Sequence, residues 1–284
     1  RVGLSRLPEL PEVETVRRGL ADRLVDFKIA QVEVCRPRAI ASSGGPDEFV
    51  AGLCGMTVGH WQRRGKYLMA ALEPEGGVWG VHLRMTGQFQ WHEHPSEPCK
   101  HTRVRFWNSK EHELRFVDVR SFGEMWWVPP GQPMEEVITG LTRLGPEPFS
   151  TDFSASYLKQ KLKGSSRPIK TALLDQALVA GAGNIYADES LFASGIAPFT
   201  PAGQLELKQL ERLRDALVNV LTISIGAGGT TFSDFRDLEG VNGNYGGQAW
   251  VYRRGGEPCR SCGTPIQREK LSGRSTHWCP TCQS

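Results

Sequence analysis

The sequence has no long hydrophobic run. No stretch of its 284 residues approaches 18 uninterrupted apolar residues, so we expect no membrane-spanning helix. Residues 1–7 lack the apolar centre of a secretory signal peptide. The chain also lacks a Walker A motif, a dinucleotide fingerprint after a strand, an HExxH pair, internal repeats and low-complexity tracts. With 39% hydrophobic and 23% charged residues, it has the composition of a soluble, intracellular globular protein long enough for two domains.

A large net charge is missing too, but the charge is unevenly placed. The net charge of +3 is too small to indicate a nucleic-acid partner by itself. Residues 248–284, however, contain six cations and two anions, so this segment is +4 and the rest of the chain is −1. A basic C-terminal module of this kind is either a phosphate-binding surface or an ordinary solvated surface, and the charge alone does not distinguish between them.

Four of the seven cysteines form two Cys-x-x-Cys pairs, Cys259/Cys262 and Cys279/Cys282, with sixteen residues between the pairs. Two thiolates on each tight turn complete a tetrahedral Zn site, so we expect one structural Zn²⁺ per chain. Two alternatives to a zinc site are less favoured. A redox-active dithiol normally uses a single Cys-x-x-Cys pair on a different fold, and structural disulfides are not expected in the cytosol. The other three cysteines have no such spacing and are expected to be plain thiols: Cys35, Cys54 and Cys99.

The hydrophobic period changes along the chain. Val13, Val16, Leu20 and Leu24 form the apolar stripe of an amphipathic helix. Residues 29–107 are expected to be mostly strands and Gly turns, with extended runs at 55–72, 78–91 and 101–107, and two further runs follow at 113–119 and 122–128. These runs predict a β-sandwich or barrel-like sheet with the first helix packed against it.

Proline and glycine breakers at 131–150 predict a linker that holds a short helix at 134–143. Further helices are expected at 153–163, 169–179, 185–194 and 204–225, with a Gly turn at 181–184. The glycine-rich segment 226–248 is expected to be a mobile loop, either a lid or an idle surface excursion. The fold class is therefore α+β, with domains at 8–135, 150–235 and 249–283 and a β-ribbon around the cysteines.

The segment 8–15 packs two prolines and three carboxylates into eight residues ahead of the first helix. Pro11 suits the first helical position, and Glu12 and Glu14 suit the positive end of the helix dipole. Taken alone, the segment is an ordinary helix start.

Several motifs nevertheless follow one another in a specific order. They are PELPEVET at 8–15, RRGKYL at 63–68, HLRMTG at 82–87, VDVRSFGE at 117–124, LGPEPF at 144–149, IKTALLDQ at 169–176, GAGNIYADESLF at 181–192 and GGTTFSDF at 228–235, followed by the cysteine module. From Pro8 to Gln283 the chain resembles the formamidopyrimidine-DNA glycosylase family. The resemblance implies an N-terminal β-sandwich domain, a helix–two-turns–helix domain and a zinc β-ribbon.

The resemblance also implies base-excision repair of oxidised purines by glycosylase and AP-lyase chemistry. Pro8 would be the nucleophile through its free amine, Glu9 the acid/base and Glu12 a supporting residue. Lys66 would assist the base and sugar chemistry, and Arg274 would grip phosphate beside the lesion. The partner would be double-stranded DNA that contains oxidised purines or abasic sites. The protein would be a monomer in the bacterial cytoplasm.

Six DNA-facing residues carry over by the same resemblance. Met85, Arg120 and Phe122 would fill the gap left by a flipped nucleotide, with Arg120 reading the orphaned cytosine. For Met85 and Phe122, spacing alone favours core packing. His101, Lys170 and Asn184 would contact phosphates. A lysine that the family often carries shortly before the IK dipeptide is missing, since Ser165 and Ser166 stand there, and Arg167 is a candidate replacement.

The residues before Pro8 decide between two alternatives. An amide nitrogen in a Leu7–Pro8 bond has no lone pair for attack, so the mechanism requires a chain that starts at Pro8. We expect Leu7 to mark a start codon whose product is processed to expose Pro8. If residues 1–7 are retained, a non-catalytic damage-binding protein is the alternative. A third alternative is an oxidised-pyrimidine glycosylase of the same fold, against which Leu10, Met85, Arg120 and Phe122 argue.

Overall fold

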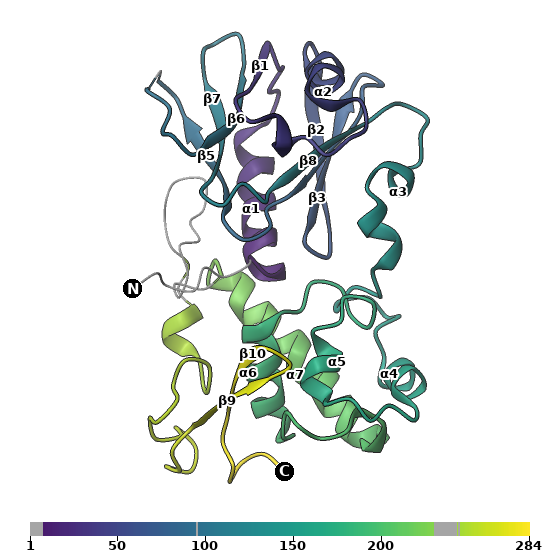
Figure 1. Ribbon diagram of the computed structural model, residues 1–284, viewed down its shortest axis with the longest axis vertical. Coiled ribbons are helices and arrows are strands. Elements are labelled where there is room, and N and C mark those ends of the chain that lie inside the picture. Colours follow the sequence, from purple (N-terminus) through teal and green to yellow (C-terminus); the bar gives the residue numbers. More distant parts are fainter. Residues whose placement is uncertain (1–7, 95, 230–242, 244) are drawn as a thin grey trace. The chain divides into compact units, whose positions relative to one another are not determined.

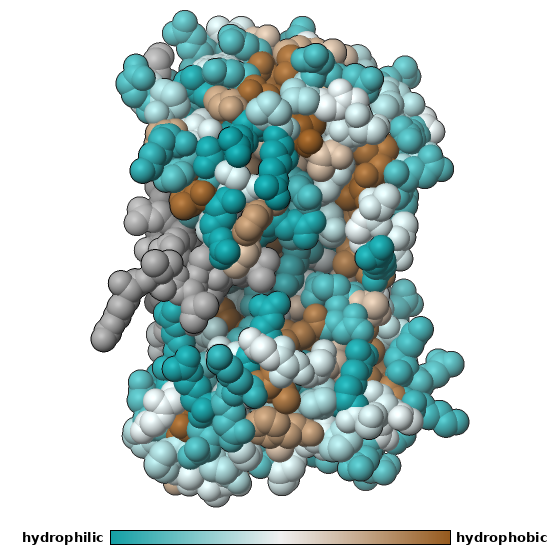
Figure 2. All heavy atoms as spheres, viewed as in Figure 1, coloured by the Kyte–Doolittle hydropathy of each residue, from teal (hydrophilic) through white to brown (hydrophobic). Residues whose placement is uncertain are grey.

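The computed structural model describes residues 8–94, 96–229, 243 and 245–284 (Figure 1). They form two compact units. The first contains the described residues of 1–142 and 227–244, and the second those of 143–226 and 245–284. In these ranges no helix is both long and apolar enough to cross a membrane. Hydrophilic side chains cover most of the face seen in Figure 2, and hydrophobic ones appear there in small separate groups.

The first unit contains two four-stranded antiparallel sheets, ordered β1-β6-β7-β5 and β2-β3-β4-β8. Their strands are β1 (Gln31–Val34), β2 (Thr57–Arg64), β3 (Tyr67–Glu73), β4 (Gly77–His82), β5 (Gly87–His92), β6 (Thr102–Trp107), β7 (Glu113–Asp118) and β8 (Glu124–Val128). Trp79 of β4 meets Phe89 and Phe106 of the other sheet with ring centroids 6.1 and 4.5 Å apart. The aromatic contacts join the two sheets, and the predicted β-sandwich is confirmed.

Helix α1 (Leu10–Arg23) packs against this sandwich. All four residues of the predicted stripe are buried in the core that the sheets share. The helix begins at Leu10, one residue before Pro11, with Glu9 as its N-cap. Because the stripe faces the sandwich, the residues at the start of the helix are fixed relative to the sheets.

Two elements differ from the sequence-based expectation. Residues 45–53 form helix α2 (Gly45–Leu53), not a strand or turn. Phe49 and Leu53 lie four apart on one face and are fully buried, and this single pair is too short a pattern to reveal a helix. The expected helix at 169–179 is also wrong at its end, because Asp175 accepts the N–H of Ala177 in a turn.

The second unit is helical and ends in a β-ribbon. Its elements are α4 (Ala155–Leu162), α5 (Ile169–Leu173), α6 (Asn184–Ser194), α7 (Leu207–Gly226), the 3₁₀ helices η3 (Ala202–Gln204) and η4 (Tyr245–Gln248), and strands β9 (Gln267–Leu271) and β10 (Arg274–Trp278). The expected helices at 153–163, 185–194 and 204–225 are confirmed, and so is the ribbon.

The segment expected as a linker is partly packed. It holds α3 (Met134–Val137) and η2 (Thr139–Arg143), and Ile138 between them is fully buried. An added Cβ at Gly80 would lie 2.5 Å from Ile138, so the segment lies tightly on β4. The division into three domains stays a prediction. Two other expectations, for residues 1–7 and for most of the 226–248 loop, lie outside the described residues.

Candidate active site and metal centre

Two of the predicted catalytic residues, Pro8 and Glu9, lie at the start of α1 together with Glu12, the predicted supporting residue. Pro8 is buried, and Glu9 and Glu12 are 5% and 2% exposed. The two carboxylates form a capping box, in which the Glu9 N–H donates to Glu12 Oε2 at 2.9 Å. The helix N-terminus carries the positive end of the dipole, which favours negative charge on carboxylates at this position.

Gly229 lies directly against Glu12. A Cβ added to it would sit 3.0 Å from Glu12 Oε1, and its φ of +84° belongs to the left-handed region. Both facts favour glycine at this position. At the far end of the loop, a Cβ on Gly243 would sit 2.4 Å from the Gly228 carbonyl oxygen. The two described ends of the glycine-rich segment therefore meet beside Glu12.

Lys66 lies in the turn between β2 and β3, which is tied to α1. Arg63 Nε lies 3.4 Å from Glu14 Oε2, and Arg63 Nη1 donates to the Gly65 carbonyl at 2.8 Å. Burial raises the pKa of Glu14, but hydrogen bonds from Arg17 and Arg18 outweigh it and hold that pKa below its usual value. Glu14 is thus a fixed anion that joins the Lys66 turn to the helix that carries Glu9.

His82, at the end of β4, is a neutral member of this region. Burial lowers its pKa well below the ordinary value, and the nearby Arg84 and Lys66 charges lower it further. Its Nδ1 accepts the Arg84 N–H at 3.0 Å, and its ring meets Tyr67 edge-on at 4.6 Å. The imidazole therefore serves as an acceptor in the turn that carries Met85.

Met85 and Phe122 come from two turns that border one hollow of about 400 Å³. The hollow is lined by Arg38, Arg84, Met85, Ser121, Phe122, Gly123 and Glu124. Phe122 is 39% exposed, so the core packing that its spacing favoured is not realised. The guanidinium of Arg120 lies 5.1 Å from its ring centroid. The structure brings the three predicted gap-filling residues together on one side of the first unit.

His101 lies just before β6, at the base of the loop that carries Arg120. Its carbonyl accepts the Asp118 N–H at 2.9 Å, and its Nδ1 is 3.4 Å from Arg103 Nη2. His101, the predicted phosphate-contacting residue, therefore lies close to the loop that carries the gap-filling residue Arg120.

In the second unit, the other DNA-facing residues meet at the start of β10. The Ser275 carbonyl accepts Asn184 Nδ2 at 3.0 Å and Lys170 Nζ at 2.8 Å, and Arg274 precedes it on the chain. Lys170 is only 1% exposed, and its ammonium lies 2.6 Å from Asp188 Oδ1. Lys170 is thus the interior cation of the cluster, and Arg274 is its exposed one.

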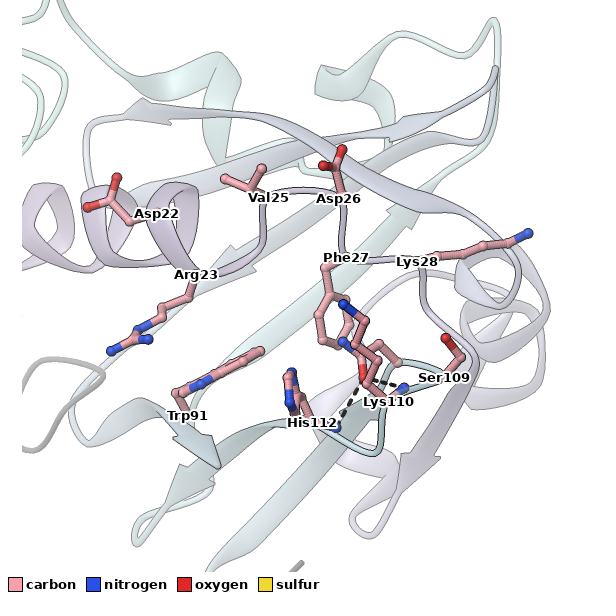
Figure 3. Close-up of a pocket in the computed structure, with 11 residues that line it drawn as sticks. Asp22, Arg23, Val25, Asp26, Phe27, Lys28, Trp91, Ser109, Lys110 and His112 are labelled. Carbon is pink, nitrogen blue, oxygen red and sulfur yellow. Dashed lines mark hydrogen bonds between the residues drawn. The ribbon is translucent and has the colours of Figure 1, made fainter. Parts of the chain in front are cut away.

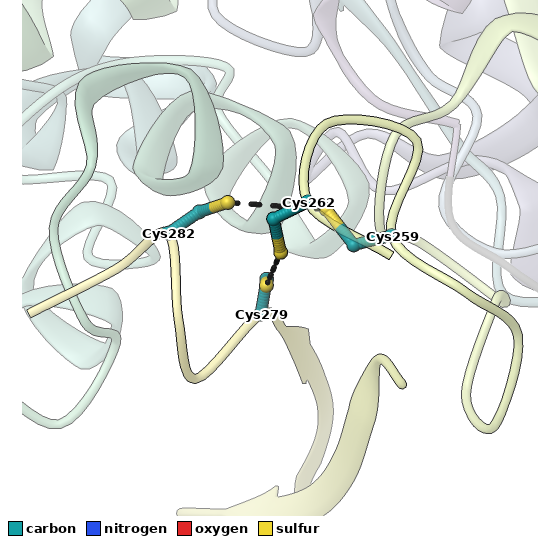
Figure 4. Close-up of side chains that lie close together, drawn as sticks. All are labelled: Cys259, Cys262, Cys279 and Cys282. Carbon is teal, nitrogen blue, oxygen red and sulfur yellow. Dashed lines mark hydrogen bonds between the residues drawn. The ribbon is translucent and has the colours of Figure 1, made fainter. Parts of the chain in front are cut away.

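The four paired cysteines converge on one point (Figure 4). Their sulfur atoms all lie within 4.8 Å of one another, with Cys259–Cys282 at 3.9 Å and Cys262–Cys279 at 3.5 Å. A tetrahedral ion with Zn–S bonds of about 2.3 Å requires sulfur–sulfur distances of roughly 3.8 Å, so the cage fits zinc. Hydrogen bonds from Thr264 lower the pKa of Cys262 to about 6.

Glu189 of α6 holds the segment that leads to this cage. Its carboxylate accepts the backbone N–H groups of Trp250, Val251 and Tyr252 at 2.8–2.9 Å. Burial nevertheless raises the pKa of Glu189. One turn further along α6, the Phe192 ring stacks on Trp250 at 5.6 Å.

Family models cover most of the chain. The Formamidopyrimidine-DNA glycosylase N-terminal domain matches residues 7–125, the Formamidopyrimidine-DNA glycosylase H2TH domain matches 144–236, and the Zinc finger found in FPG and IleRS matches 256–284.

The chain belongs to the formamidopyrimidine-DNA glycosylase family.

Full-length relatives agree with this membership. The formamidopyrimidine-DNA glycosylase of Parasynechococcus marenigrum is 79% identical over 98% of this chain and 100% of its own length. A Lactococcus lactis Fpg bound to Fapy-dG containing DNA has a TM-score of 0.87 at 35% identity, covering 97% of this chain and 100% of that chain. Wild-type Lactococcus lactis Fpg with an oxidised pyrimidine containing DNA gives 0.88 at 35% identity, over 98% and 100%. The predicted fold class, with its glycosylase sandwich, helix–two-turns–helix domain and four-cysteine ribbon, is confirmed.

The glycosylase sequence also contains supporting residues that motif reasoning did not single out. Asp118, Thr86, Asp188 and Gly229 each contact a predicted site residue or its turn, and all four lie inside the family-like motifs. Their partners are distant in sequence: Thr86 and Asp118 are 32 residues apart. Local patterns do not reveal such pairs.

A second hollow, of about 390 Å³, lies at the C-terminal end of α1 (Figure 3). Trp91 and His112 line it with rings 5.5 Å apart, and Asn108 Oδ1 accepts the N–H groups of Lys110 and His112 at 3.0 Å. Charges of both signs surround it, and none of the predicted glycosylase site residues lines it.

Proposed function

We propose that this chain excises oxidised purines, 8-oxoguanine and formamidopyrimidines, from duplex DNA and then cleaves the strand by β,δ-elimination. Family membership makes it a base-excision repair DNA glycosylase that acts on damaged DNA. The observation that carries the residue assignment is the buried Pro8–Glu9–Glu12 group at the start of α1. The chain acts as a monomer in the cytoplasm.

Pro8 is the nucleophile. An α-amino group has a reference pKa of about 7.7–8.0 against about 10.4 for lysine, so more of it is unprotonated at neutral pH. Its lone pair forms the bond to the sugar C1′ while the bond from C1′ to the damaged base breaks, and the base leaves with that electron pair and a proton. Because the amine is secondary, opening of the sugar gives an iminium directly.

Glu9 and Lys66 act on the groups around that bond. Glu9 protonates the ring oxygen as the sugar opens and serves the later Schiff-base steps. Glu12 accepts the Glu9 N–H and so fixes the backbone beside Pro8. Lys66, whose turn is joined to α1 through Arg63 and Glu14, assists the base and the sugar.

The remaining residues hold DNA. Met85, Arg120 and Phe122 refill the stack, with Arg120 reading the orphaned cytosine, because nucleotide flipping costs a few kcal/mol of stacking. His101, Asn184, Lys170 and Arg274 face phosphates, which position the duplex without reading its sequence. For Lys170, a direct contact demands movement, since Asp188 and Ser275 already surround its ammonium. One structural Zn²⁺ per chain, held by four cysteines, orients the ribbon that carries Arg274.

Borohydride trapping tests this assignment. Two proteins are compared on an 8-oxoguanine:cytosine duplex: one processed to begin at Pro8, and one retaining residues 1–7. The first is expected to form a covalent adduct whose modified residue is Pro8, and the second to bind DNA without trapping. Adduct formation at a lysine, or equal trapping by both proteins, would contradict the role of Pro8. Tight binding without trapping by the processed protein would support a damage-binding protein instead.

Oxidised pyrimidines are a second candidate substrate class, because the Lactococcus lactis relative forms a complex with an oxidised pyrimidine containing DNA. Parallel excision assays on 8-oxoguanine:cytosine and thymine-glycol duplexes separate the two. We expect faster release of 8-oxoguanine, and a faster release of thymine glycol would reverse the assignment.

A further inference from the structure

One buried carboxylate serves both turns that carry the gap-filling residues. Asp118, the last residue of β7, is fully buried, and in the described part of the chain no lysine, arginine or histidine forms a salt bridge with it. Its oxygens accept the hydroxyl of Thr86, the N–H of Arg120 at 3.2 Å and the N–H of Gly123 at 2.7 Å. A buried carboxylate without a cationic partner depends on such donors.

Thr86 completes the link between the turns. Its hydroxyl donates to Asp118 Oδ1 and accepts the Arg120 N–H at 3.0 Å, using its one donor and one of its two lone pairs. The Arg120 N–H is therefore shared between the hydroxyl and the carboxylate. Met85 precedes Thr86, and Phe122 follows Arg120 by two residues, so this bridge joins the two segments that present all three gap-filling side chains.

Each turn contains a glycine that is closely packed against its surroundings. A Cβ on Gly87 would lie 2.5 Å from the Leu83 carbonyl oxygen and 2.7 Å from the Phe116 ring. A Cβ on Gly123 would lie 2.6 Å from the same ring and 3.0 Å from Asp118 Oδ2.

The backbone of each turn is also strained. Arg84 and Ser121 have φ of +54° and +56°, a region that non-glycine residues seldom adopt. Such strain persists where surrounding contacts impose it and is common at ligand clamps. The hydrogen bonds to Asp118 and Thr86 supply those contacts.

We propose that Asp118 and Thr86 are positioning residues, which lock Met85, Arg120 and Phe122 into one preformed wedge before DNA binds. The inference rests on the proposed DNA glycosylase function and deepens it. A wedge that is already ordered loses less conformational freedom when it enters the base stack, so more binding energy goes into extruding the damaged nucleotide. Removal of the bridge should therefore affect extrusion and reading of the opposite base more than the later chemistry.

The test compares Thr86→Val with Thr86→Ser. Valine keeps the shape and removes the hydroxyl, whereas serine keeps the hydroxyl. Single-turnover excision of 8-oxoguanine opposite cytosine and opposite adenine is measured, together with cleavage of a preformed abasic site. Thr86→Val is expected to slow excision opposite cytosine about tenfold and to narrow the cytosine-over-adenine preference, since a shared N–H loses one acceptor. Abasic-site cleavage should change less than about twofold, and Thr86→Ser should behave as the parent protein.

Asp118→Asn is the second variant, because its amide places a donor against the N–H of Arg120 or Gly123. At a temperature well below its melting point, this variant should also excise 8-oxoguanine more slowly and cleave the abasic site at nearly the parent rate. Equal losses on both substrates would show a merely structural role and overturn the proposal, as would an unchanged opposite-base preference in Thr86→Val. Failure of the proposed function is distinct, since the unsubstituted protein would then neither release the base nor cleave the abasic site.

Discussion

Glu113 is a buried carboxylate of the first unit that lies between two arginines. Its side chain is 1% exposed and lies between Arg105, at 2.7 Å, and Arg115, at 2.8 Å. Burial raises the pKa of this carboxyl, but hydrogen bonds from Arg115 and Arg105 outweigh it and hold the pKa below the ordinary value. A carboxylate whose pKa is lower in the folded state stabilises the fold above the unfolded pKa, and the contribution disappears as pH falls through the folded pKa.

Glu113→Gln is therefore expected to lower the free energy of unfolding by about 3 kcal/mol at pH 7, because it leaves a buried guanidinium without its counter-ion. Urea unfolding across the pH range measures this. The difference from the parent protein should begin to shrink below about pH 4, where the unfolded-state carboxylate binds a proton, and should disappear once the folded-state carboxylate is protonated as well.

Glu33→Gln is the matched control, since Glu33 pairs with the same Arg105 but is 50% exposed. It should cost at most about 0.5 kcal/mol. A Glu113 effect that does not vary with pH would show that packing, and not charge, accounts for it.

At the scale of elements, the zinc ribbon has little apolar packing of its own. Its buried core consists of Val251, Cys259, Ile266 and Cys279. A core of this size is too small to order two strands by itself, so we expect the module to depend on a bound metal.

Removal of the metal by a chelator is expected to release one Zn²⁺ per chain and to abolish hydrogen-exchange protection in β10 while α7 keeps its own. Duplex affinity should fall together with the loss of protection, because Arg274 and the Asn184 partner Ser275 lie on that strand. Metal analysis and amide exchange measure the two effects. Protection of β10 that survives complete metal loss would contradict the dependence.

The elements that the sequence predicted correctly are those whose pattern repeats. The apolar stripe of α1 consists of four residues at helical spacing, and all four are buried. In β6, the alternation buries Val104 and Phe106 and leaves Arg103 and Arg105 partly exposed, as expected. Helix α2 was not predicted because its sequence shows only one hydrophobic pair at helical spacing. The end of α5 was placed too late because a single side-chain hydrogen bond, from the Ala177 N–H to Asp175, forms the turn after the helix. The bridge between Thr86 and Asp118 was missed since it forms only when two separate turns fold onto Phe116.

At the scale of the whole molecule, the net positive charge lies in the C-terminal segment that contains Arg274, one of the four proposed phosphate contacts. Residues 248–284 carry +4, and the rest of the chain carries −1. Association with DNA releases counter-ions in proportion to the phosphates that are neutralised, so affinity should fall steeply with salt.

Arg274→Ala is expected to weaken duplex binding and to reduce the slope of log K against log salt by about 1. Titrations at several salt concentrations measure it. Arg274→Lys, which keeps the charge and loses the planar fork, should retain the slope. An unchanged slope in the alanine variant would remove Arg274 from the phosphate contacts.

Trp250, which stacks on Phe192, is one of the few tryptophans of the second unit, and the tryptophans are unevenly divided between the two units. Six of the eight tryptophans belong to the first unit, and Trp250 and Trp278 belong to the second. Trp278 directly precedes Cys279, and Trp250 is 45% exposed on the segment held by Glu189. Loss of order around the cysteines is therefore expected to alter the emission of these two tryptophans and to leave the six of the first unit in their folded environment. Tryptophan fluorescence can therefore report on order in the cysteine module without any added label.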